Sequence, residues 1–289
     1  MVDNAILQNI LTFGPVFLLL AARALAMIEV APLLSSEAIP QIAKVSLAGL
    51  TAFAVIPTAE VFFAGNSAGL VTLPGGEVTD LRYAPFNFSF LFLILGEAII
   101  GLIIGFYLMI IFAAFSTAGQ FFSLQMGFGA SETFDPIGQI ENPLMGQYLN
   151  LVSMLIFISI GGFTQLFLGG FWRSVQTINI ISLIEGRETV VSMLTTGLSK
   201  LFMDAMVISL PILGTLFLTT LATGLISKAA PQINILQEGF PISITVAFIL
   251  IAASLPFMTE TFSRMIESGF GTIESLYTQI GIPITEGAR

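Results

Sequence analysis

The sequence has 289 residues, of which 55% are hydrophobic and only 9% are charged, and its mean hydropathy is +0.96. A soluble globular domain carries roughly 25% charged residues, so most of this chain must face lipid or other protein rather than water. The chain contains no cysteine and no histidine and has a formal net charge of −9, which excludes disulfides and a Ser-His-Asp triad and argues against nucleic acid binding.

The hydrophobic residues gather in six stretches, and a helix that crosses a membrane needs about 20 of them. In chain order the stretches are about 10–34, 45–63, 88–118, 149–172, 201–226 and 240–257. Pro57 is expected to interrupt the second stretch, and Pro211 lies inside the fifth. The pattern predicts an all-α, multi-helix membrane protein.

The third stretch is longer than a bilayer requires. Its 31 residues would form a helix of about 46 Å, whereas the hydrocarbon core is only about 30 Å thick. Either this helix tilts strongly or it continues beyond the bilayer inside a protein assembly, and we favour the assembly. Gly101 and Gly105 lie four residues apart on it and form a face that allows close approach of another helix.

A segment at the end of this stretch, residues 119–130, fits neither water nor lipid. No charged residue lies between Glu97 and Glu132, and Gly119, Gly127 and Gly129 argue against an uninterrupted helix. Irregular backbone cannot be satisfied by lipid, so the segment is expected to be enclosed by protein or to line a cavity. It is either an apolar pore seal, which would stop ions by dewetting, or a buried connection without a gating role. The residues of the segment that could form such a seal are Phe121, Phe122, Leu124, Gln125, Met126, Gly127, Phe128 and Gly129.

Several charged residues lie in or near the apolar stretches, where each costs about 2.5–3.5 kcal/mol at a helix centre. They indicate either a proton or substrate relay or polar contacts in the structure and between subunits, and we favour the contacts. Lys200 and Asp204 are four residues apart and could pair locally. The candidate polar residues are Arg23, Lys44, Glu97, Asp204 and Lys228.

The C-terminal part is expected to be an amphipathic tail, residues 261–289, that follows a main helical domain, residues 1–260. Its polar side carries Glu260, Glu267 and Glu274, so docking on a partner is favoured over docking on anionic lipid. The apolar face consists of Phe262, Met265, Ile266, Phe270, Ile273, Leu276, Tyr277 and Ile280.

Three segments carry a resemblance to a known family. The first contains Arg23, Ala31-Pro32, Ile39-Pro40 and Lys44. The second contains Thr117-Ala118-Gly119, Leu124-Gln125-Met126-Gly127 and Asp135-Pro136. The third runs from Lys228 through Ala229-Ala230-Pro231-Gln232-Ile233-Asn234-Ile235 to Gly239-Phe240-Pro241. In order, spacing and hydropathy the chain resembles the FliR/SctT family over about residues 10–260.

This resemblance implies a subunit without enzymatic activity or cofactor in the export gate of a flagellar basal body, in the bacterial inner membrane. It implies helical hairpins that assemble with FliP and FliQ around a central pore, partly above the bilayer plane. It also implies that the segment 119–130 plugs the pore, that FlhB wraps the closed gate, and that unfolded flagellar proteins pass through.

Three alternatives remain at this stage. The first is an injectisome export gate subunit of the SctT type, and the second is a self-contained multi-pass transporter or channel. The third is an intramembrane enzyme, which would need a carboxylate pair or a Ser-Lys dyad. The adjacent Ser227 and Lys228 do not fit such a dyad, because their side chains diverge.

Overall fold

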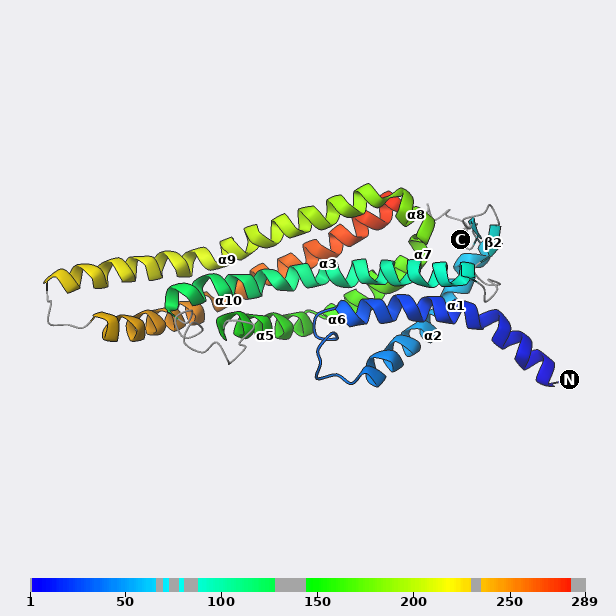
Figure 1. The fold of residues 1–289 in the computed structure, drawn as a ribbon, viewed down its shortest axis with the longest axis horizontal. Helices are drawn as coiled ribbons and strands as arrows, with labels where there is room; N and C mark the ends of the chain where they lie inside the picture. The colour runs from blue at the N-terminus through cyan, green and yellow to red at the C-terminus, as the bar shows by residue number, and fades with distance from the viewer. Residues whose placement is uncertain are drawn as a thin grey trace. The chain divides into compact units, whose positions relative to one another are not determined.

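The computed structural model describes residues 2–65, 70–72, 78–80, 88–127, 144–229 and 235–281, and these are almost entirely helical. The predicted all-α fold is confirmed, and each of the six hydrophobic stretches lies largely in helix (Figure 1). The elements in chain order are α1 (Val2–Val30), α2 (Gln41–Gly65), β1 (Leu70–Thr72), β2 (Val78–Asp80), α3 (Phe88–Met126), α5 (Leu144–Ser159), α6 (Gly162–Thr164), the π-helix η3 (Gln165–Trp172), α7 (Arg173–Thr177), α8 (Ile180–Glu185), α9 (Arg187–Ala229) and α10 (Ile235–Ile280).

Between the second and third stretches, β1 and β2 pair as two short antiparallel strands, with Leu70 opposite Asp80. Pro57 does not act as expected. Helix α2 continues through Pro57 to Gly65, so the predicted interruption is wrong, and α9 likewise runs through Pro211. Apolar helices tolerate proline, because neighbouring groups re-satisfy the freed backbone.

Three helices are long and apolar enough to cross a membrane, among the residues that the structure describes. They cover Phe90–Met126, Arg187–Ala229 and Pro241–Ile280, with 37, 43 and 40 residues. The pair Leu144–Ser159 and Gly162–Thr177 would add a fourth crossing as one broken span. Gly161 makes this break possible, because its φ of 71° is a left-handed conformation that favours glycine.

The chain divides into two compact units. Unit 1 comprises Met1–Met109, Gly161–Thr195 and Ser268–Arg289. Its α1 backbone lies directly against α3, since a Cβ atom added to Gly105 would lie 2.7 Å from the Met27 carbonyl oxygen and one added to Gly101 would overlap the Arg23 carbonyl. The predicted close approach at these two glycines is therefore confirmed.

Unit 2 comprises Ile110–Ile160 and Thr196–Glu267. Its core is built on Phe112, Phe115, Phe157 and Phe262, whose rings meet edge to face with centroids 4.5–5.3 Å apart. Edge-to-face pairs place the positive ring edge on the negative ring face and contribute about 0.5–1.5 kcal/mol beyond burial.

Candidate functional site

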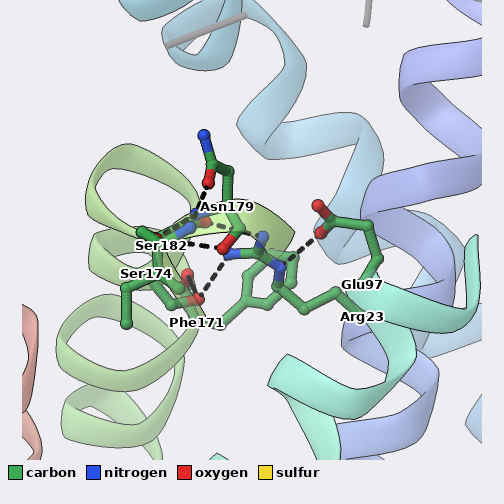
Figure 2. A network of polar contacts seen from close by, with 7 residues as sticks. Arg23, Glu97, Phe171, Ser174, Asn179 and Ser182 are labelled. Atoms are coloured by element: carbon green, nitrogen blue, oxygen red, sulfur yellow. Dashed lines mark hydrogen bonds and ion pairs between the residues drawn. The ribbon is translucent and has the colours of Figure 1, made fainter. Parts of the chain in front are cut away.

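A buried polar cluster centred on Arg23 lies inside unit 1 and joins three parts of the chain (Figure 2). The Arg23 Nε donates to Oε2 of Glu97 on α3 over 2.6 Å. Its two terminal nitrogens donate to the Ser174 hydroxyl over 3.1 Å and to the Ile178 carbonyl over 3.0 Å. Arg23 and Glu97 are only 2% and 7% exposed. The guanidinium thus ties α1 to α3 and to the end of α7.

The chemistry of arginine explains this arrangement. Its planar fork of five N–H donors can serve several acceptors at once, whereas the lysine ammonium acts as a point charge. Burial of an unpaired guanidinium would be strongly unfavourable, and the carboxylate of Glu97 together with two neutral acceptors satisfies it. The cluster connects three segments of unit 1 through hydrogen bonds. It contains one carboxylate, so it does not form the chain of facing carboxylates that a proton relay needs.

Lys44 makes a second ion pair, at the turn between α1 and α2. Its ammonium donates to the Glu29 carboxylate over 3.1 Å and to the Ser35 carbonyl over 3.2 Å. Leu33 within the turn has a φ of 71°, a left-handed conformation that is unusual for leucine. The pair closes the α1–α2 hairpin next to this strained residue.

The remaining two predicted polar residues belong to α9 in unit 2. Asp204 is partly buried, and Lys200 lies one turn earlier on the same helix. Lys228 is exposed in the last turn of α9, where a cation interacts favourably with the helix dipole. Arg23 and Lys44 belong to separate ion pairs within unit 1. Since Arg23, Glu97 and Lys44 are satisfied within one chain, they do not require contacts between subunits.

The predicted plug segment differs from expectation in its backbone. Helix α3 continues to Met126, so the expected irregularity is wrong for residues 119–126. Gly119 does not break the helix. Its missing side chain allows α3 and α5 to pack closely, because a Cβ atom added to Gly119 would lie only 2.6 Å from the Met145 carbonyl oxygen. The helix ends where Gly127 adopts a φ of 89° and its N–H bonds to the Leu124 carbonyl.

The plug residues divide between two faces of α3. Phe122 and Met126 are fully buried in unit 2, whereas Leu124 is 66% exposed and Gln125 is also exposed. Phe121 is partly buried. Phe128 and Gly129 lie outside the described residues. The part of the segment that can meet another molecule therefore begins with Leu124 and Gln125.

The apolar face predicted for the tail exists, but it packs within the chain. Phe262 joins the aromatic core of unit 2, and Tyr277 donates a hydrogen bond of 2.6 Å to the Gly170 carbonyl in unit 1. Docking on a partner is therefore the wrong interpretation of this face. Helix α10 passes residues 260 and 261 without a break.

Sequence reasoning missed Ser174, Ile178 and Tyr277 as members of the polar contacts. A signal existed nearby, because Asn179 and Ser182 form a capping box at the start of α8, with hydrogen bonds of 2.8 and 3.1 Å. That signal places a helix start directly after Ile178, whose carbonyl accepts from Arg23. In the described part of the chain, no group of three or more Asp or Glu residues is placed to hold a metal ion.

Comparison with known proteins gives consistent matches. The pattern of the family described as "Bacterial export proteins, family 1" matches residues 15–269. The flagellar biosynthetic protein FliR of Escherichia coli is 28% identical over 262 residues, which cover 89% of this chain and 91% of the relative. FliR of Bacillus subtilis is 25% identical over 278 residues, which cover 96% and 100%. FliR of Borreliella burgdorferi is 33% identical over 188 residues, which cover 65% and 70%.

Proposed function

Since this chain belongs to the FliR family of bacterial export proteins, we propose that it is a subunit of the flagellar type III protein export gate. Its relatives are flagellar biosynthetic proteins and not enzymes. In the proposed gate the chain forms, with FliP-like and FliQ-like subunits, the pore for unfolded flagellar proteins. An FlhB-like subunit contacts the closed gate. The gate lies in the bacterial inner membrane, within the basal body, and part of it stands above the bilayer plane.

The observation that carries this proposal is the length of the apolar helices. The three candidate spans, of 37, 43 and 40 residues, would be about 55–65 Å long, roughly twice the hydrocarbon thickness of about 30 Å. Large apolar side chains are exposed along them, including Leu91 near the start of α3 and Leu225 near the end of α9. Lipid alone does not cover this length, which supports a gate in which other protein subunits cover the remainder.

The spacing of the exposed residues indicates that the cover is helical. On the part of α3 in unit 1, exposed apolar residues repeat at alternating intervals of three and four, which is the spacing of a helix-packing seam. They are Phe92, Leu95, Ile99, Leu102, Phe106 and Met109. Helix α5 in unit 2 repeats the pattern with Leu144, Tyr148, Leu151, Leu155 and Ile158. Such seams support packing against the helices of neighbouring gate subunits.

The proposal includes the plug. Helix α3 anchors the plug segment through Phe122 and Met126, which are buried in unit 2, and presents Leu124 and Gln125 on its outer side. Gly127, which ends the helix, starts the connection that follows. An apolar side chain held by a fixed helix at a narrow point can exclude water and ions. We therefore propose that the segment from Leu124 onward closes the pore.

Co-purification tests the proposed assembly. A tagged chain, expressed with the FliP-like and FliQ-like proteins of its own genome, should be recovered in one complex with both and should be degraded when expressed alone. Recovery of the chain as a stable single subunit that transports a small solute into liposomes would contradict the gate and favour a transporter. Flagellar genes beside its gene would support the flagellar system over an injectisome.

A further inference from the structure

The π-helix η3 in unit 1 needs support that its own backbone does not supply. Eight residues in the π register are unusual, because π-helices occur mostly as single turns. At the C-terminal end of η3 the π-helical hydrogen-bond pattern is no longer regular. The Arg173 N–H is shared between the Leu168 carbonyl, which fits the π register, and the Gly170 carbonyl, which does not. The carbonyl of Gly170 also accepts the Tyr277 hydroxyl over 2.6 Å, and the carbonyl of Phe171 accepts the Ser174 hydroxyl over 2.7 Å.

These hydroxyls connect η3 to two different helices. Ser174 itself accepts a hydrogen bond from Arg23 on α1, as Figure 2 shows. Tyr277, only 4% exposed, belongs to the last turns of α10. Unit 1 therefore holds the end of η3 through Arg23 and Ser174 and also through the C-terminal end of α10.

The end of α10 fits closely against the segment that follows η3 as well. A Cβ atom added to Gly186, between α8 and α9, would lie 2.7 Å from Cβ of Ile280. One added to Gly281 would lie 3.2 Å from Cβ of Thr177, at the end of α7. Glu274 forms an exposed ion pair with Arg173. The family pattern ends at residue 269, so all the α10 residues in these contacts lie beyond it.

We propose that residues 270–281, the end of α10 together with Gly281, act as a latch that holds η3 in its π register in addition to the contact made by Arg23. Without the latch, η3 can rewind as an α-helix. Such a change shifts the hydrogen-bond register by one residue and turns the side chains that follow by about 100° around the helix axis. The latch thereby fixes the direction in which the chain leaves the broken span toward α8.

Disulfide cross-linking tests the latch, because the native chain has no cysteine. A Cβ atom at Gly170 lies 3.3 Å from Cγ2 of Ile104 on α3, so the pair Ile104→Cys with Gly170→Cys should cross-link in the native register. The chain is studied in membranes with its whole export complex, and thiols that remain free are counted with a maleimide polymer.

Tyr277→Phe removes only the hydroxyl and should lower the cross-linked fraction at least threefold. The matched control is Thr278→Ala, which changes an exposed hydroxyl on the same turn and should leave cross-linking unchanged. Truncation after Gly269 should abolish cross-linking. Equal cross-linking in the parent and in Tyr277→Phe would overturn the latch, as would an equal loss in both point variants or no cross-link in the parent.

Discussion

The ion pair between Arg23 and Glu97 leads to a quantitative prediction. Replacing Glu97 by leucine leaves a guanidinium that is only 2% exposed without its counter-ion. Breaking a buried pair from one side destabilises a protein by about 3–5 kcal/mol, because the remaining charge cannot be hydrated. We expect Glu97→Leu to lower the free energy of unfolding by that amount.

Removing both charges should lower the free energy of unfolding by less than removing Glu97 alone. In Arg23→Met with Glu97→Leu no buried charge is left. The carbonyl of Ile178 still loses its donor, and a buried acceptor without a partner costs about 1–3 kcal/mol. The double variant should therefore recover about 2 kcal/mol relative to Glu97→Leu, without reaching the stability of the parent.

A double-mutant cycle measures this coupling. The readouts are unfolding of the purified export complex in detergent and the amount of complex in the membrane. Glu267→Leu, which removes an exposed carboxylate on α10, is the control and should change stability by less than about 0.5 kcal/mol. The reasoning is refuted if Glu97→Leu matches this control, or if the double variant loses the full sum of the two single effects.

Three further predictions use the same stability measurement or a conductance measurement. Lys44→Met should cost only about 1 kcal/mol, well below Glu97→Leu, because the side chain of Glu29 is 36% exposed and can be hydrated; an equal loss in both variants would contradict this. Gly119→Ala should destabilise by about 1–3 kcal/mol through overlap with the neighbouring backbone, whereas Gly214→Ala, with open space around it, should be neutral or slightly stabilising. Leu124→Asn should raise ion leak through the assembled gate severalfold at an unchanged amount of complex, and unchanged conductance in lipid bilayers would remove this residue from the plug.

Local composition was sufficient to predict the helices. Runs of apolar residues predicted six helical stretches, because hydropathy over about 20 residues is a property of the segment itself. The close approach at Gly101 and Gly105 was equally predictable, since a missing Cβ atom is visible in the sequence. The predicted excess length of the third stretch is confirmed by the 39 residues of α3.

The polar contacts depended on information that local patterns do not contain. Arg23 and Glu97 are 74 positions apart, and Tyr277 and Gly170 are 107 apart. No periodicity links such residues, so the sequence identified the buried charges without their partners. The backbone at Gly119 was misjudged for a different reason. Glycine often breaks a helix, but here its lack of a side chain serves packing inside an apolar helix.

Each of the two units is stabilised internally by a different kind of contact. In unit 1, the guanidinium of Arg23 and the hydroxyl of Tyr277 fix neighbouring segments through hydrogen bonds with defined angles. In unit 2, the helices meet through phenyl rings and through the glycine at position 119. Contacts of this kind use no polar group, so such a surface can repack without leaving a polar group unsatisfied. We infer that unit 1 resists rearrangement, whereas unit 2, which contains Leu124 and Gln125 of the proposed plug, can adjust its packing.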